Sequence, residues 1–452
     1  MSRRQKFSAL GWIFIGVFIY ALSAMAVSRE LVIPRFFPAA VEGHIPGDPY
    51  YYHLLAMNKA GKIETEGIQE FELRPTGQGS AGVASLAYLV YENPYGIVLI
   101  NAFLHGISAV AMAMLLLKWF PLRTAIIAIV PLAISPYMMI WFSQVNKDSF
   151  AVVGALLFMY GLMQLVSADE KSLLRSGWIS LLAMVAGMAF LWVVRPYVNQ
   201  ILLPIVAMVL VLVLLLRTIG SYRPLGREGV VFSIYGVFVL VCLGILGQGA
   251  ASDKTLRSFD SYVSESKTGT VSANCLEKID IHNWRNAQFL PDYVDNKLKA
   301  MMGQRCLIFT VLETQNNPAT LRSIIDSDRL PGGSPEALYY LPRAVLLGVL
   351  SPWPEDWGYI FSNGPSFFYT IVPLEALLLY AGLVSLCFWL WRTREWSILI
   401  PVGMSVGVMS IYAMATPFLG ALYRYRYPWW MLLICLGSAA SLELIRSTSR
   451  GG

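Results

Sequence analysis

Long apolar runs recur along the chain from one end to the other. Each extends for roughly 18–25 residues, the length at which an α-helix crosses the hydrocarbon core of a bilayer. Within them, apolar and polar residues do not alternate at period two, as they do in the strands of a membrane β-barrel. The pattern therefore predicts an all-α polytopic membrane protein with about ten transmembrane helices. The predicted spans are 8–27, 96–117, 122–142, 150–167, 177–194, 199–216, 229–248, 367–391, 396–415 and 427–445.

Two long polar segments, 28–95 and 249–366, interrupt the apolar pattern. The first is expected to carry amphipathic helices. The second has the scattered charges and the Pro- and Gly-containing turns that are typical of a small globular subdomain. We therefore predict an N-terminal transmembrane module (1–248) of about seven helices that includes the first loop, a subdomain (249–366), and a C-terminal transmembrane module (367–452) of about three helices.

Composition and charge exclude a soluble protein and orient the chain. Of the 452 residues, 56% are hydrophobic and only 14% are charged, against roughly 25% charged in an ordinary soluble domain. The two termini and the short loops on the same side hold 14 Lys/Arg and 5 Asp/Glu, and short loops rich in Lys and Arg stay in the cytoplasm. This predicts cytoplasmic termini, with both long polar segments outside. No basic surface for nucleic acid is indicated, and the pattern is typical of a bacterial inner membrane.

Two of the five cysteines, Cys275 and Cys306, lie in the second long segment. If this segment faces an oxidising compartment such as the periplasm, a disulfide between them is expected. Two unpaired buried thiols are the alternative. The chain has no Cys or His spacing typical of a structural zinc site.

One segment has the glycine spacing of the dinucleotide-binding fingerprint but not its structural context. The segment 77–82 reads GQGSAG, but no strand precedes it and no βαβ unit surrounds it. We interpret it as a turn that leads into an amphipathic helix near 83–91.

Four polar segments lie where predicted helices meet the outer surface. The first is GDPYYYH at 47–53. A proline and aromatic rings flank Asp48 and can set its hydration and hydrogen bonding, as a general base requires. Tyr51 and His53 are candidate substrate contacts. An Asp-Pro turn followed by an interfacial aromatic belt is the alternative.

The second and third segments are short loops between predicted helices. In SQVNKDS at 143–149, Lys147 can hold a phosphate and Asp148 can orient it or bind an acceptor hydroxyl. A solvated hairpin tip is the alternative. In RPY at 195–197, Arg195 lies at a membrane boundary, where a charge is costly and often functional. Snorkelling to the interface is the alternative for Arg195.

The fourth segment, YRYRYP at 423–428, precedes the last predicted helix. Its residues Arg424 and Arg426, with Arg343 in the short amphipathic stretch 337–350, can bind a phosphate bidentately, while the tyrosines stack on a sugar or an isoprenoid. An aromatic anchor at the outer edge is the alternative.

Together, segments 47–53, 146–148 and 423–428 make the sequence resemble the GT-C membrane glycosyltransferases, which use polyprenyl-phosphate sugar donors. The resemblance implies that Asp48 acts as catalytic base or positions the acceptor. It also implies a donor such as an undecaprenyl-phosphate sugar and an active site at the periplasmic face. The expected acceptor is a hydroxyl of a glycan, a lipid or a protein. The expected reaction is a single displacement that inverts the anomeric carbon. The candidate phosphate ligands are Lys147, Arg195, Arg343, Arg424 and Arg426.

The chain departs from the metal-dependent branch of that family because Lys147 stands where a further carboxylate would help to bind a metal. We therefore expect no cofactor, with cationic side chains stabilising the leaving phosphate. Catalysis with Mg²⁺ or Mn²⁺ is the alternative.

Other functions fit the same pattern. The chain can be a polymerase or ligase of lipid-linked glycans, as O-antigen enzymes are, or it can glycosylate a secreted protein such as a pilin. A flippase or transporter for lipid-linked sugars is the non-enzymatic alternative. Transporters place charged sites near the bilayer midplane in interrupted helices, whereas the charges here cluster at the outer edge.

Overall fold

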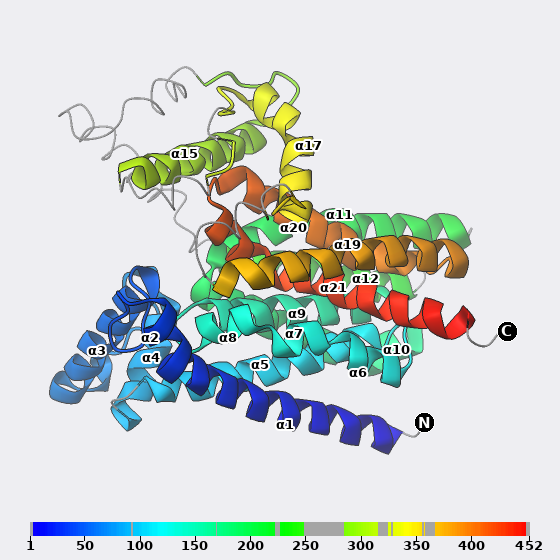
Figure 1. The fold of residues 1–452 in the computed structure, drawn as a ribbon. Helices are drawn as coiled ribbons and strands as arrows, with labels where there is room; N and C mark the ends of the chain where they lie inside the picture. The colour runs from blue at the N-terminus through cyan, green and yellow to red at the C-terminus, as the bar shows by residue number, and fades with distance from the viewer. Residues whose placement is uncertain are drawn as a thin grey trace. The chain divides into compact units, whose positions relative to one another are not determined.

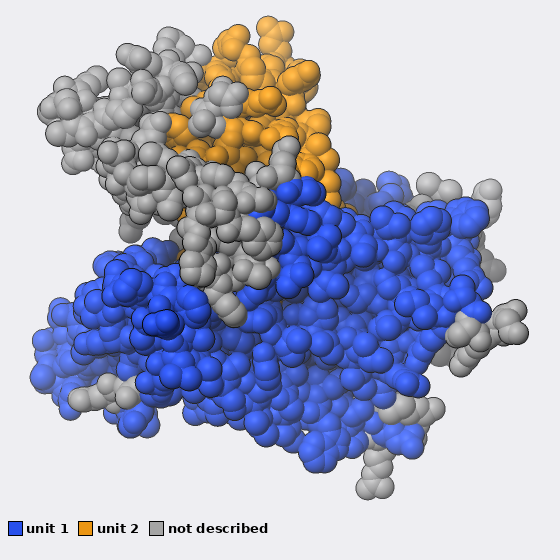
Figure 2. All heavy atoms as spheres, in the orientation of Figure 1, with its two compact units in different colours: residues 1–249, 354–402, 431–452 blue, residues 250–353, 403–430 orange. Residues whose placement is uncertain are grey.

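The computed structural model describes residues 3–91, 94–168, 170–221, 227–247, 284–314, 324–326, 329–354, 357 and 367–448. Over these residues the chain is α-helical and forms no sheet, only isolated bridges between single residues. It falls into two compact units, shown in Figure 2. Unit 1 comprises residues 1–249, 354–402 and 431–452, and unit 2 comprises residues 250–353 and 403–430. The three-part division drawn from the sequence stays a prediction.

Figure 1 shows the helices along the chain. Those that lie wholly in unit 1 are α1 (Arg3–Val27), η1 (Ser28–Val32), α2 (Ile33–Phe36), α3 (Asp48–Glu66), η2 (Ile68–Glu70), η3 (Pro75–Gly77), α4 (Gly79–Val90), α5 (Tyr95–Leu116), α6 (Leu122–Ala128), α7 (Val130–Ile134), α8 (Pro136–Phe142), α9 (Asp148–Val166), α10 (Glu170–Val194), α11 (Pro196–Ser221), α12 (Arg227–Gly247), α19 (Phe367–Thr393) and η5 (Trp396–Ile398). Those of unit 2 are α15 (Asp292–Thr314) and α17 (Ser334–Leu350). Residues of both units form α20 (Leu399–Ala415) and α21 (Leu419–Thr448).

The described helices confirm the predicted all-α membrane fold. Nine of them are long and apolar enough to cross a bilayer, and a tenth span results when one bent helix pair is counted as a single crossing. Between its ends, a helix pairs its backbone N–H and C=O groups with one another, which is why apolar runs of this length fold as helices in lipid. The protein is therefore a multi-pass membrane protein.

Two predicted helix ends are wrong. The first span continues beyond residue 27 through the π-helical turn η1 into α2, and it ends at Phe36. The last helix begins at Leu419, not near 427, so Arg424 and Arg426 lie inside α21 and not before it. Arg and Tyr adopt helical backbone angles readily, so α21 extends past the apolar run that marks its membrane-spanning part.

The bent pair lies where the sequence predicts one span, at 122–142. The segment Leu122–Ile134 and the helix Pro136–Phe142 differ in direction by 54°. Between them, Ser135 has a non-helical backbone (φ −50°, ψ 109°). Pro136 has no N–H to donate to the preceding turn, which accounts for the interruption.

Glycines bring α9 and α10 into close contact. A Cβ on Gly161 would lie 2.6 Å from the carbonyl oxygen of Ser180, and a Cβ on Gly187 would lie 2.6 Å from that of Gly154. Small residues allow helix backbones to approach this closely in membranes. The α9–α10 hairpin is therefore packed backbone against backbone over much of its length.

The first long loop folds as a helical hairpin in unit 1. Helices α3 and α4 pack through small and aromatic side chains, and Val145 of the loop between α8 and α9 completes the same buried cluster. The cluster comprises Tyr52, Ala56, Ala60, Ala81, Ala84, Tyr88, Ile97 and Val145. This contact holds α3 beside the loop that carries Lys147.

Candidate functional site

Asp48 begins α3 and is exposed to solvent. Gly47 precedes it with φ +107°, a backbone conformation that favours glycine, and Pro49 pre-sets the first helical turn. A carboxylate in a first turn is stabilised by the helix dipole. Within the described part of the chain, Asp48 makes no ion pair or side-chain hydrogen bond. Its carboxylate is therefore accessible to a ligand.

Lys147 lies beside the same helix. Its Nζ is 4.9 Å from the centroid of the Tyr52 ring, and its backbone N–H donates to Oδ1 of Asn146 at 2.8 Å. Tyr52 is four residues after Asp48, and side chains at i and i+4 share a helix face. The Tyr52 contact therefore brings a cation to the part of α3 that bears Asp48.

The next residue, Asp148, forms a buried ion pair with Arg195. The Asp148 side chain is 1% exposed and that of Arg195 is 3% exposed. Asp148 begins α9 and Arg195 follows α10, so the pair joins the open end of the α9–α10 hairpin. Buried charges persist when they are paired. We call the set Asp48, Tyr52, Lys147, Asp148 and Arg195 the Asp48 edge.

Asn101, which the sequence reading missed, supports this edge from α5. Its Nδ2 donates to the carbonyls of Phe142 (2.7 Å) and Gln144 (3.2 Å), and its Oδ1 accepts from Ser149 (2.6 Å). Asn101 therefore holds the backbone before Lys147 and the side chain of Ser149 after it. The signal available in the sequence was an asparagine within an apolar run, because a buried amide needs partners.

His53 lies in a buried polar cluster in unit 1. Its Nε2 is 2.8 Å from Oε2 of Glu42, and its Nδ1 is 2.8 Å from the Tyr88 hydroxyl. The His44 ring stacks on it with centroids 4.2 Å apart. Arg29 borders the cluster and donates to the Glu42 backbone carbonyl. The His53 ring is thus held by protein groups, whereas its neighbour Tyr51 is half exposed and open to a ligand.

Burial changes the protonation of this cluster. It is the largest of the effects that lower the pKa of His44 to about 2, and the nearby Arg29 and His53 act in the same direction. Burial also lowers the pKa of His53, against the opposing effect of Glu42, and raises the pKa of Tyr88 well above its usual range. Both histidines are therefore held neutral in the folded protein.

We expect the protein to lose stability as the pH falls below about 6.5, the ordinary pKa of histidine. The unfolded chain then binds a proton at His44 that the folded chain excludes until about pH 2, so each pH unit in that window costs up to about 1.4 kcal/mol. Thermal unfolding between pH 7.5 and 5.0 measures this effect. His44→Phe is expected to flatten the dependence, and an unchanged slope in this variant would contradict the assignment.

In unit 2, Arg426 is fully buried and caps the C-terminal end of α17. The last carbonyls of a helix lack intrahelical donors, and the guanidinium supplies them. The Trp430 ring covers it at 4.8 Å. Arg426 thus fixes α17 to α21, and both of its Nη atoms already donate to protein groups. Its acceptors are the carbonyls of Leu347 (3.0 Å), Gly348 (2.9 Å) and Ser351, and Oγ of Ser351 (2.9 Å).

Arg343 of unit 2 binds Asp326 through two hydrogen bonds, from Nε at 3.2 Å and from Nη2 at 3.1 Å. Tyr340 donates to the same carboxylate at 2.9 Å. Burial alone raises the pKa of Asp326, but the bonds from Arg343 and Tyr340 outweigh it and lower the pKa overall. Arg343 is therefore already paired, and Arg424 on α21 is half-buried.

Cys306 lies buried in α15 and is disulfide-bonded. Cys275 is outside the described residues, so the predicted Cys275–Cys306 pairing stays a prediction. The described cysteines Cys242, Cys387 and Cys435 are free thiols.

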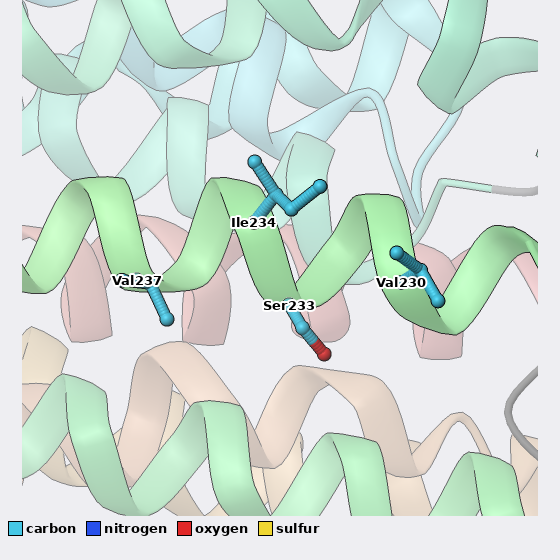
Figure 3. Close-up of a pocket in the computed structure, with 4 residues that line it drawn as sticks. All are labelled: Val230, Ser233, Ile234 and Val237. Carbon is cyan, nitrogen blue, oxygen red and sulfur yellow. The ribbon is translucent and has the colours of Figure 1, made fainter.

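A hollow of about 400 Å³ lies along α12, shown in Figure 3. Val230, Ser233, Ile234 and Val237 line it, all from one helix. None of the candidate site residues reaches it, and three of its four lining side chains are apolar. It is therefore separate from the Asp48 edge.

No protein-family model matches the chain, and no curated protein matches it.

Proposed function

We propose that the protein is a glycosyltransferase that moves a sugar from a polyprenyl-phosphate donor to an acceptor hydroxyl. The observation that carries this proposal is that an exposed carboxylate begins α3 and a cation contacts the next turn of the same helix. Asp48 opens the helix, and Lys147 lies over the ring of Tyr52 one turn further on. Base and phosphate ligand are the two groups that such a transfer requires.

In the proposed reaction, Asp48 accepts the proton of the acceptor hydroxyl. The resulting oxygen nucleophile attacks the anomeric carbon and forms the new glycosidic bond. The bond from that carbon to the phosphate oxygen breaks, and the polyprenyl phosphate leaves with the electron pair, its negative charge stabilised by Lys147. A single displacement inverts the configuration of the anomeric carbon.

Asp148 and Arg195 act as positioning residues in this proposal. Their ion pair is buried, so it fixes where α9 begins and hence where the adjacent Lys147 lies. Lys147 is half-buried against an aromatic ring, a contact worth about 0.5–2 kcal/mol. A phosphate within reach offers the ammonium a stronger, charge-assisted partner.

We further propose that this edge faces the periplasm of a bacterial inner membrane. The excess of Lys and Arg in the short loops on the opposite side supports that orientation.

Product analysis tests the proposed activity. Membranes containing the protein are incubated with a panel of radiolabelled polyprenyl-phosphate sugars, and the products are separated by thin-layer chromatography. Transfer of label to a new product from one donor is expected, and a ladder of products would identify a polymerase. Absence of transfer from every donor, beyond membranes lacking the protein, would contradict the proposal.

Activity is expected to persist in excess EDTA. Mg²⁺ and Mn²⁺ require several oxygen ligands in near-octahedral order. At the Asp48 edge only Asp48 offers an exposed carboxylate, because Asp148 is committed to Arg195, and Lys147 would repel a dication. Turnover with and without EDTA measures the effect. Loss of activity that Mn²⁺ or Mg²⁺ restores would assign Asp48 to a metal.

One observation favours a transporter of lipid-linked sugars as the second candidate. Glu375 lies within the candidate span Ile371–Thr393 and is 6% exposed. Ser135, at the break in the bent span, donates to its Oε1 at 2.8 Å. Tyr20 and His105 bind the carbonyls of Ile134 (3.0 Å) and Ala133 (3.1 Å) at the same break. Interrupted helices with a buried carboxylate are typical of transporters.

Glu375→Gln separates the two candidates. The amide keeps a hydrogen-bond acceptor for Ser135 but cannot carry a charge. A transferase whose chemistry lies at the Asp48 edge is expected to keep its turnover within about twofold, since an isosteric change at a distant site leaves the reacting groups in place. Loss of movement of a fluorescent lipid-linked sugar across proteoliposomes, with no transferase activity in the wild type, would favour the transporter.

A further inference from the structure

The turn before α4 and the first turn of that helix hold polar atoms that have no hydrogen-bond partner within the described structure. Nε of Arg74, Oε1 of Gln78 and Oγ of Ser80 are buried and make no hydrogen bond. The Ser80 side chain is fully buried. Leaving a buried polar group unpaired costs about 1–3 kcal/mol. Three such atoms within seven residues therefore destabilise the ligand-free protein, and hydrogen bonds to a ligand can offset this.

This turn adjoins the Asp48 edge through the end of α10. The Arg74 guanidinium lies 5.1 Å from the centroid of the Trp192 ring. Gly79 packs against Val193, the residue after Trp192. The contact is so close that a Cβ on Gly79 would lie 2.0 Å from the Val193 carbonyl oxygen. Arg195, two residues further on, pairs with Asp148 beside Lys147. A short series of contacts within unit 1 thus connects the turn to the proposed phosphate ligand.

The three atoms differ in hydrogen-bonding character. Nε of Arg74 only donates, Oε1 of Gln78 only accepts, and Oγ of Ser80 does both. A phosphate diester offers acceptors alone, so it would leave Gln78 unsatisfied and repelled. Sugar hydroxyls donate and accept, and they match the whole set.

We propose that Arg74, Gln78 and Ser80 form the subsite that binds the sugar of the donor. This inference rests on the proposed transferase function. It gives the GQGSAG segment a role in binding a sugar, whereas its letter match to the dinucleotide motif gives it none. Lys147 then binds the phosphate on one side of the scissile bond, while the turn binds the sugar on the other. Ordering of the sugar hydroxyls by this turn selects among donors.

Ser80→Ala tests the subsite because it separates stability from binding. Removing an unpaired buried hydroxyl is expected to raise the thermal unfolding temperature of the ligand-free protein. The same change is expected to weaken binding of the polyprenyl-phosphate sugar that the wild type uses by about threefold to tenfold, the effect of one lost hydrogen bond. Binding of the sugar-free polyprenyl phosphate of equal length is expected to stay unchanged. Titration with the two radiolabelled lipids measures both affinities.

Ser85→Ala is the matched control. Ser85 is also buried in α4, but its Oγ donates to the Gly82 carbonyl at 2.8 Å, so this variant is expected to lower stability slightly and leave both affinities unchanged. Equal affinities in Ser80→Ala and Ser85→Ala would overturn the subsite while leaving the transferase intact. If the wild type bound neither lipid, the transferase and the subsite would both be rejected.

Discussion

Asp48→Asn is expected to lower the turnover number about 10²–10⁴-fold, the usual cost of removing a general base. The amide retains the size of the carboxylate and the first turn of α3, but it cannot accept the proton of the acceptor hydroxyl. Because the proposed phosphate ligand Lys147 is unchanged in this variant, donor affinity is expected to change little. Steady-state kinetics, with donor binding measured separately, checks both expectations.

Glu64→Gln is the matched control for this variant. Glu64 is also an exposed carboxylate on α3, sixteen residues and about 24 Å along the helix from Asp48. This control is expected to keep wild-type turnover. If Asp48→Asn also kept it, Asp48 would not be the base, and the proposed mechanism would have to be abandoned.

Breaking the Asp148–Arg195 pair is expected to have the largest effect on stability. Arg195→Met leaves the Asp148 carboxylate buried without its cation, a loss of about 3–5 kcal/mol in comparable pairs. The beginning of α9 then shifts or takes in water, and Lys147 moves with it. Thermal unfolding in detergent is expected to occur at a markedly lower temperature, and donor binding is expected to weaken.

The double variant Asp148→Leu with Arg195→Met identifies the cause. It removes both charges, so the penalty for an unpaired buried carboxylate disappears and most of the stability is expected to return. If the double variant unfolded at the same temperature as Arg195→Met alone, loss of packing would account for the effect, and the ion pair would not.

The sequence predicts the spanning helices well because a membrane requires an apolar run of fixed length. It does not predict the break at Ser135, since 122–142 has the length and composition of one crossing. Pro136 was the available signal, but a proline within a membrane helix is often tolerated when neighbours supply the missing hydrogen bonds. Here those neighbours are Tyr20 and His105, which lie far from the break in sequence.

In the candidate site, too, the sequence predicts local features but not the contacts between distant segments. Asp48, Lys147 and Asp148 stand out in the sequence because their local segments are polar at the end of an apolar run. Their partners do not, because the contact of Lys147 with Tyr52 and that of Asp148 with Arg195 join segments 95 and 47 residues apart. Only packing of the first loop and of the α9–α10 hairpin brings them together.

The roles of the arginines were the least predictable part. The sequence places Arg195 at a membrane boundary and predicts that Arg426 binds a phosphate before the last helix, but it does not indicate that both side chains are buried. A pattern of Arg and Tyr does not distinguish a guanidinium that binds a substrate phosphate from one that caps a helix, since both use the same donors. The carbonyls at the end of α17, which decide the case for Arg426, lie in another segment of the chain.

The glycine contacts between α9 and α10 also act at a distance. Gly161 lies thirteen residues from Asp148, or about 20 Å along the helix axis. A side chain placed there would wedge the two helices apart near their connecting turn, and a small change in the angle between them would become a larger displacement at the open end. The glycine contact near the turn therefore determines the positions of Asp148 and Arg195 at the opposite end of the hairpin, and with them the geometry of their ion pair.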